Sequence, residues 1–156
     1  MKCDANTFAK MYEMIHKDLY RFAFYMMKHA QDAEDAVSDA VVSAYENVGK
    51  LKKPEAFKNW MFTILANKCK KKLKNPSGKE MPLEHYEVKE EFDMGISVDI
   101  KKAFFVLTKE ERLIISLSVF GGYNSSEIAN MQKLNANTVR SKRKRALEKM
   151  SYLLES

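Results

Sequence analysis

The residues best suited to chemistry in this 156-residue chain are the arginines and lysines near its C-terminus. Between residues 137 and 149, basic side chains outnumber acids heavily, and Glu148 is the one carboxylate. A helix with this charge can lie along DNA phosphates, and arginine can also make paired hydrogen bonds to guanine. The basic set comprises Arg140, Lys142, Arg143, Lys144, Arg145 and Lys149. We therefore interpret this segment as a DNA-binding helix.

Two short helices in sequence are expected to present that segment. Asn124, followed three residues later by Glu127, is typical of a capped helix start, and Asn135 is typical of a second one. Such a pair is the layout of a helix-turn-helix, whose second helix enters the major groove. A solvated helix face is the alternative explanation for the charge. The coincidence of two caps with one-sided charge favours DNA binding.

Composition and charge restrict the fold and the partner. Only five glycines and three prolines interrupt the chain, and apolar residues recur at spacings of three and four, so we expect an all-α protein. A hydrophobic content of 46% suffices for packed cores in one domain or two small ones. The net charge of +6 predicts a polyanionic partner, with nucleic acid a better candidate than a membrane surface.

Other classes of protein fit the sequence poorly. No apolar stretch is long enough to span a bilayer and no signal-peptide core is present, so we expect a cytoplasmic protein without stable membrane insertion. Cys3 and Cys69 lie far apart, which favours two reduced thiols over a disulfide or a zinc site. The scattered histidines have no evident nucleophile or acid-base partner; they are His16, His29 and His85. We therefore expect no enzyme activity, no metal and no cofactor.

A second basic surface is predicted in the first half of the chain. Apolar spacing predicts one or two helices over residues 5 to 29, then a helix from a cap at Asp32 to Gly49, then a third helix from about Pro54 that buries Trp60. The expected outer side of this third helix consists of Lys58, Phe62, Thr63, Asn67, Lys70, Lys71 and Lys74. Glu55 is the one acid among residues 50 to 79, so this side is strongly basic.

The outer stripe of the preceding helix has the opposite character. It is acidic with one apolar residue inside it, and it contains Asp35, Ser38, Asp39 and Val42. Charged residues around an apolar contact are a plausible pattern for a protein interface. An exposed acidic helix face without a partner is the alternative.

The composition divides the chain into two domains. A stretch containing proline, glycine and mixed acids follows the third helix and is typical of a linker. Beyond it, helices from about Val98 and from a cap at Thr108 join the helix-turn-helix in a four-helix module. We predict a first domain over residues 1 to 75, a linker over 76 to 97, and a second domain over 98 to 156.

The order of these features resembles a bacterial RNA polymerase sigma factor of the extracytoplasmic-function (ECF) class of the sigma-70 family. Region 2 of that family is suggested by LYRFA at residues 19–23, DAEDAVSDA at 32–40, AYEN at 44–47 and AFKNWMFTILAN at 56–67. Region 4 is suggested by LTKEER at 107–112, EIA at 127–129 and NTVRSK at 137–142. A single helix-turn-helix would be a weak signal, whereas this ordered set covers nearly the whole chain.

The resemblance implies roles for the two surfaces of the first domain. The acidic stripe, with Asp35, Ser38, Asp39 and Val42, would bind the clamp helices of the largest subunit of the polymerase core. The second basic surface would bind and open the minus-ten element of promoter DNA, where a basic track and a base pocket offset the cost of unstacking. The residues implied for the minus-ten element are Lys50, Lys52, Lys53, Asn67, Lys70, Lys71 and Lys74.

The resemblance also implies that the C-terminal helix recognises the minus-thirty-five element. The residues implied are Asn137, Thr138, Arg140, Ser141, Lys142, Lys144 and Arg145, with Arg140 the first candidate for reading a base. Three positions depart from the family pattern: Lys133 replaces the usual turn glycine, Gln132 a common core leucine, and Arg143 an apolar residue. Arg143 would either extend to the surface or shift the core towards Leu147.

The leading hypothesis is an ECF-type sigma factor that binds RNA polymerase core, directs it to promoters and promotes strand opening. A partner common in this family is an anti-sigma factor that covers both domains, so we expect one. The alternative is a stand-alone helix-turn-helix regulator that binds duplex DNA without polymerase. For that regulator, the second basic surface and the acidic stripe would be incidental.

Overall fold

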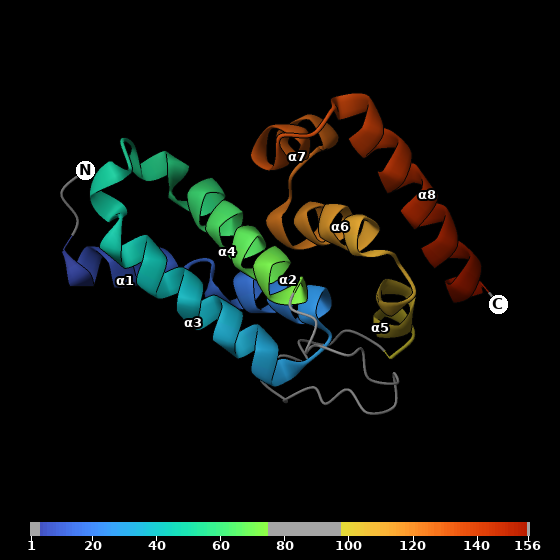
Figure 1. Ribbon diagram of the computed structural model, residues 1–156, viewed down its shortest axis with the longest axis horizontal. Coiled ribbons are helices and arrows are strands. Elements are labelled where there is room, and N and C mark those ends of the chain that lie inside the picture. The colour runs from blue at the N-terminus through green and yellow to red at the C-terminus, as the bar shows by residue number, and fades with distance from the viewer. Residues whose placement is uncertain (1–3, 75–97, 156) are drawn as a thin grey trace.

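The computed structural model describes residues 4 to 74 and 98 to 155 (Figure 1). The first range holds α1 (Ala5–Glu13), α2 (His16–Met27), α3 (Ala30–Glu46) and α4 (Phe57–Leu73). Two 3-10 turns, η1 (Val48–Lys50) and η2 (Pro54–Ala56), join α3 to α4. The second range holds α5 (Val98–Phe105), α6 (Lys109–Gly121), α7 (Ser125–Gln132) and α8 (Ala136–Glu155).

The regular structure of both ranges is helical, which confirms the all-α prediction. Within the same two ranges, no helix combines the length and the apolar character that a bilayer crossing requires. The predicted linker, residues 76 to 97, lies outside the described residues. The domain limits drawn at residues 75 and 98 therefore stay predictions.

Side-chain caps start several of the helices, and the one at Thr108 was predicted from the sequence. Asp4 accepts a hydrogen bond from the backbone N–H of Thr7 at 2.8 Å, and Thr108 and Glu111 form a reciprocal capping box at the start of α6. The predicted cap at Asp32 is wrong, because α3 begins at Ala30 after an extended His29 without a side-chain cap bond. Ala30 is buried, so packing against the core extends the helix beyond its expected start.

Helices α2, α3 and α4 form the core of the first half of the chain. α2 buries Leu19, Phe22 and Ala23 completely, and it packs against both α3 and α4. The inner face of α3 consists mainly of alanines, among them Ala36 and Ala40, whose small side chains let the neighbouring backbones approach closely. α3 consequently lies along the outside of the α2–α4 pair and leaves its opposite face exposed (Figure 1).

In the second half, α8 crosses α5, α6 and α7 and so holds them together (Figure 1). Val139, Ala146 and Met150 supply the buried face of α8, and Ile128 supplies that of α7. α6 is buried along most of its length because α2 covers one side of it and α8 another. These helices form the predicted four-helix module.

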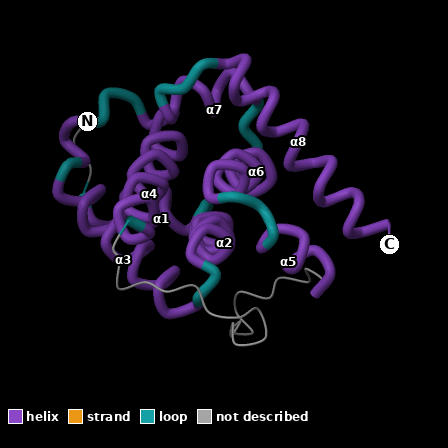
Figure 2. Tube along the Cα trace, turned by 45° about the vertical axis from the view of Figure 1, so that its right-hand side comes forward, coloured by secondary structure: helices purple, strands orange, loops and turns teal. Residues whose placement is uncertain are grey.

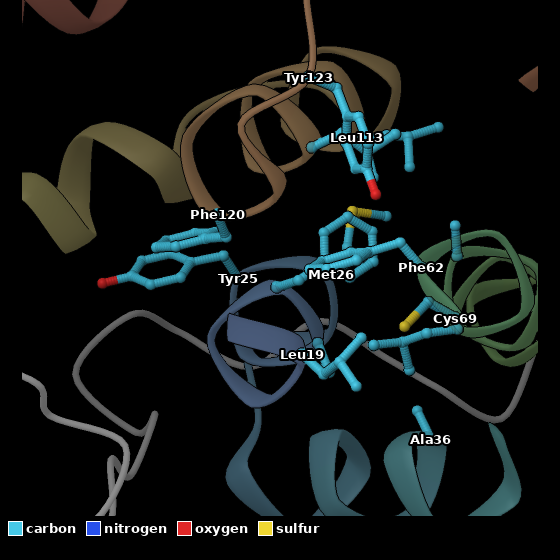
Figure 3. Packing of buried hydrophobic residues seen from close by; sticks show 14 of the residues in the cluster. Leu19, Tyr25, Met26, Ala36, Phe62, Cys69, Leu113, Phe120 and Tyr123 are labelled. Carbon is cyan, nitrogen blue, oxygen red and sulfur yellow. The ribbon is translucent and has the colours of Figure 1, made fainter. Parts of the chain in front are cut away.

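The two halves share one hydrophobic core (Figure 3). The ring of Tyr25 in α2 stacks on Phe120 of α6, with centroids 5.2 Å apart, and lies 4.4 Å from Phe104 of α5. Phe62 of α4 meets Tyr123, which follows α6, edge to face at 5.8 Å. Figure 2 shows α2 beside α6 from a second direction. The core is therefore continuous from the first helices to the last.

A buried arginine reinforces this contact between the halves. Arg112 of α6 is 1% exposed, and its guanidinium donates to the carbonyl of Met26 at 3.0 Å and to that of Leu107 at 3.1 Å. The Met26 carbonyl belongs to the last turn of α2, where backbone acceptors lack partners within the helix. A buried guanidinium is costly unless it is hydrogen-bonded, so these bonds favour a fixed position of α6 on α2.

Candidate nucleic-acid and polymerase interfaces

Helices α7 and α8 form the predicted helix-turn-helix. Asn124 and Glu127 make a reciprocal capping box at the start of α7, with hydrogen bonds of 2.8 and 2.9 Å. Asn135 starts α8, because its side-chain oxygen accepts a hydrogen bond from the backbone N–H of Asn137 at 2.8 Å. Both caps predicted from the sequence are confirmed.

The turn between these helices keeps a left-handed residue although it lacks glycine. Lys133 has φ 56° and ψ 44° and ends α7 with its backbone N–H bonded to the Ala129 carbonyl. A left-handed conformation costs a residue with a Cβ roughly 1–2 kcal/mol, so the surrounding packing must hold this turn in place. The departure at Lys133 therefore does not change how the turn is built.

One face of α8 is open to solvent near its N-terminus. The exposed residues there include most of those predicted to bind the minus-thirty-five element: Asn137, Thr138, Arg140, Ser141, Lys144 and Arg145. The guanidinium of Arg140 is hydrogen-bonded to the side-chain oxygen of Asn137 one turn earlier. Lys142 is half-buried and forms an ion pair with Glu110 of α6. This contact directs Lys142 towards α6, unlike the other members of the predicted set.

The position of Arg143 on α8 decides whether the buried face of this helix shifts towards Leu147. Arg143 is half-buried, whereas Leu147 is 47% exposed. The buried face still runs through Val139, Ala146 and Met150, so the core has not shifted towards Leu147. Arg143 and Leu147 instead line a shallow groove beside Arg140 and Lys144.

The predicted minus-ten residues lie on α4 and on the segment before it. Lys50, Lys52 and Lys53 are exposed around η1 and η2, and Asn67, Lys71 and Lys74 are exposed on α4. Helical spacing puts Lys70 on the same side of α4 as these last three. Lys70 differs from them because it is half-buried and donates to the side-chain oxygen of Gln132 in α7. Burial lowers the pKa of Lys70, and the nearby charge of Lys74 lowers it further.

The prediction that Phe62 lies on the outer side of α4 is wrong. Phe62 is fully buried between Phe22 of α2 and Tyr123, because the second half of the chain packs against this side of α4. Lys58, one turn earlier, donates to the Gly121 carbonyl at 2.6 Å and lies 5.2 Å from the Tyr123 ring centroid. Part of the expected outer face is thus an internal contact, which local periodicity could not reveal. Trp60 is half-buried beside Phe57 and belongs to the edge of the core.

The acidic stripe of α3 is exposed as predicted. Its residues Asp35, Ser38, Asp39 and Val42 all face solvent, and Val42 is 57% exposed although it is apolar. Gln31 donates to Asp35 at 3.1 Å, and Lys72 of α4 lies 3.0 Å from Asp39. These contacts orient the two carboxylates at the surface without burying them.

The fold and these surfaces together describe an all-helical DNA-binding protein with a helix-turn-helix and a separate acidic face. Two family models match the chain: Sigma-70 region 2 over residues 11–77, and Sigma-70 region 4 over residues 99–150. The chain belongs to the sigma-70 family of RNA polymerase sigma factors, in its ECF class.

Curated relatives match over most of their length. The RNA polymerase sigma factor SigV of Bacillus subtilis is 31% identical, and the match covers 89% of this chain and 86% of SigV. The ECF RNA polymerase sigma factor SigM of Mycobacterium tuberculosis is 27% identical, with 97% of this chain and 79% of SigM covered. The protein is therefore a sigma factor that directs RNA polymerase to promoters for transcription initiation, and sigma factors are not enzymes.

Solved structures share the fold. The sigma factor RpoE from Bartonella quintana, in complex with the anti-sigma factor NepR, superposes with a TM-score of 0.76 at 21% identity, covering 97% of this chain and 98% of RpoE. CnrH, in complex with the cytosolic domain of CnrY, gives a TM-score of 0.69 at 21% identity and covers 97% of this chain and 90% of CnrH. Residues 11–77 match region 2 and residues 99–150 match region 4, so α5 belongs to the second of the two sigma domains.

Proposed function

We propose that the three surfaces described above divide the work of promoter recognition. The exposed face of α8 binds the minus-thirty-five element, the basic side of α4 with the segment around η1 and η2 binds the minus-ten element, and the acidic stripe of α3 binds the polymerase core. The main support is that two basic surfaces lie on different domains while the acidic stripe lies on a third face. Such a distribution suits one protein that bridges a polymerase and two DNA elements.

The face of α8 has the chemistry for duplex recognition. Arg140 offers a guanidinium that can bond to both acceptors of a guanine, and Asn137 holds it one turn from the start of the helix. Lys144 and Arg145 follow on exposed positions where they can neutralise phosphates. We assign base reading to Arg140 and phosphate binding to the two later residues. Lys142 has a structural role, because its ammonium is paired with Glu110.

The basic side of α4 is suited to a single strand after the duplex opens. Opening costs a few kcal/mol for each unstacked base, and contacts to the separated strand must offset that cost. Lys71 and Lys74 provide charge for the backbone of the strand, and Asn67, one turn before Lys71, provides an amide for a base edge. Lys50, Lys52 and Lys53 extend this track towards the start of the helix.

The acidic stripe of α3 suits the basic clamp helices of the largest polymerase subunit. Asp35 and Asp39 give charge complementarity, and the exposed Val42, three residues after Asp39 at one end of the patch, gives an apolar contact.

We further infer that an anti-sigma factor controls the protein. RpoE and CnrH, which share the fold, were solved with NepR, an anti-sigma factor, and with the cytosolic domain of CnrY. The end of α8 supplies exposed apolar side chains that a protein partner could cover, including Leu147 and Tyr152. Because its polymerase and its promoters are cytoplasmic, we place the protein in the cytoplasm.

Run-off transcription tests this function. Core polymerase is incubated with genomic promoter fragments, with and without the purified protein, and we expect discrete transcripts only when the protein is added. Duplex binding is measured in parallel without polymerase. Strong sequence-specific binding by the free protein, combined with no initiation when core is present, would instead support a stand-alone regulator.

A further inference from the structure

Arg143 of α8 carries a guanidinium that no other residue in the described part of the chain binds. Its side chain is half-buried, and its Nε is buried without a hydrogen bond. Glu148 lines the same groove, yet no ion pair joins its carboxylate to Arg143. Nearly all buried polar groups in proteins are hydrogen-bonded, so an unpaired one indicates a partner that binds from outside.

The groove around Arg143 opens on the face of α8 that we assign to the minus-thirty-five element. It is lined by Ser125 from the start of α7 and by Arg140, Lys144 and Leu147 from α8. Arg143 follows Arg140 by three residues, which places the two side chains about 60° apart around the helix axis. α7 packs against α8 (Figure 1). Arg143 therefore lies between the proposed DNA-binding face and α7.

Packing alone does not account for an arginine at this position. The neighbouring inward positions of α8, Val139, Ala146 and Met150, are apolar and buried. The aliphatic part of Arg143 can extend that apolar face while its guanidinium lines the groove. A methionine would bury a similar apolar surface without an unpaired polar group. The guanidinium thus costs stability in the free protein, and an anion in the groove would offset that cost.

The phosphate backbone of duplex DNA is the anion that suits this groove. In helix-turn-helix complexes the second helix lies in the major groove while the first crosses the backbone, so a strand passes the junction of the two helices. A phosphate there can accept paired hydrogen bonds from the guanidinium of Arg143. The hydroxyl of Ser125 can donate a further bond to the same phosphate.

We propose that Arg143 is a further DNA-binding residue, which binds one backbone phosphate at the edge of the minus-thirty-five element. This inference rests on the proposed function of α8. A phosphate contact carries no base information, so Arg143 strengthens binding to DNA of any sequence. Arg140, one turn earlier on the open face, provides the preference for particular bases.

A scan with neutral phosphates tests the contact in the polymerase holoenzyme. Each duplex contains a promoter identified by run-off transcription and carries one methylphosphonate, which removes the charge of a single phosphate in or beside the minus-thirty-five element. Affinity is measured for holoenzymes with the wild-type protein and with Arg143→Met. We expect one linkage at which the wild-type protein loses about tenfold in affinity and Arg143→Met loses nothing, because the variant already lacks that contact.

The salt dependence of binding is a second measurement. Arg143→Met should lower the slope of log affinity against log salt concentration by about 1, and equally on a duplex with altered minus-thirty-five bases. Lys102→Met is the control, because it removes one charge from an exposed position of α5 in the same domain, and its slope should be unchanged. An effect of Arg143→Met confined to one base sequence would mean that Arg143 reads a base, and would overturn the proposal.

The melting temperature of the free protein separates DNA binding from a structural role. Because methionine removes an unpaired guanidinium, Arg143→Met should melt at or above the wild-type temperature. Arg143→Lys keeps the test informative if Arg143→Met does not fold, since it retains the charge but loses the paired bonds and should show a smaller loss at the same linkage. A lower melting temperature in both variants, with every sensitive linkage retained, would overturn the proposal.

Failure of this inference is distinguishable from failure of the proposed function of α8. If α8 does not bind the minus-thirty-five element, no linkage in that element affects the wild-type protein, and Arg140→Ala leaves promoter affinity unchanged. If Arg143 alone is wrongly assigned, the wild-type protein has sensitive linkages and Arg143→Met keeps all of them.

Discussion

Arg140 occupies the best position on α8 for reading a base. Its side chain is exposed, and the bond to Asn137 restricts the guanidinium before DNA arrives. Ordering the group in advance lowers the entropy lost on binding. Neighbouring cations such as Lys149, which donates to Glu111 at 2.8 Å, are instead bound to α6. Arg140 should therefore determine sequence preference more than any other cation of this helix.

We predict that Arg140→Ala lowers promoter-dependent transcription about 10- to 100-fold, the cost of one lost arginine–guanine pair. Affinity for core polymerase should remain at the wild-type level, because Arg140 is remote from α3. Run-off transcription and a core-binding titration measure the two effects. Arg140→Lys keeps the positive charge but lacks the planar fork that makes paired bonds to guanine, so it is the control for charge, and an equal loss of core binding in Arg140→Ala would contradict the assignment.

Single residues show which contacts could be predicted from the sequence and which could not. Asn124 and Thr108 were predicted as caps because the partners of a cap lie within three residues along the chain. Phe62 was assigned to an outer face and Gln132 was noted only as a departure. Their partners, Tyr123 and Lys70, are remote in sequence, and no local spacing encodes a contact between two domains.

At the scale of elements, α3 and α4 differ in how well a single apolar stripe describes them. α3 has one buried face and one exposed face, and its stripe was correctly predicted from spacing. α4 is covered by α2 and α3 on one side and by α6 and α7 on another. Its apolar residues consequently occupy more than one face, which is why the sequence predicted a wider outer surface than α4 has.

We predict that the double variant Asp35→Lys and Asp39→Lys binds core polymerase at least 10-fold more weakly, because two attractive contacts with basic helices become repulsive. Asp39→Lys also removes the ion pair with Lys72, an exposed contact that contributes little to folding. Surface plasmon resonance with immobilised core measures the change. The melting temperature is the control for folding. Unchanged affinity for core polymerase would contradict the assignment of the acidic stripe to core binding.

At the scale of the whole molecule, the shared core makes the two domains interdependent. Tyr25 packs against aromatic residues from α5 and α6, and Arg112 bonds to the end of α2. The composition of the linker predicted two domains, and both sigma domains match the chain. The packing of one domain against the other could not be predicted from the spacing of apolar residues, because an apolar residue on a helix does not specify which neighbour buries it.

We predict that the free protein unfolds thermally in a single cooperative transition. Burial of Tyr25, Phe62 and Phe120 at one contact links the stabilities of regions 2 and 4. Differential scanning calorimetry should give a ratio of calorimetric to van't Hoff enthalpy close to one. Two resolved transitions in the wild-type protein would mean that the regions unfold independently.

The same aromatic contact has a consequence for synthesis of the chain on the ribosome. Region 2 leaves the ribosome first, so Tyr25 and Phe62 are exposed until α5 and α6 have been made. Translation adds about 5–20 residues each second, which leaves this apolar surface uncovered for several seconds. The nascent chain is therefore most prone to aggregation, and most accessible to chaperones, in the interval between completion of α4 and emergence of Tyr123.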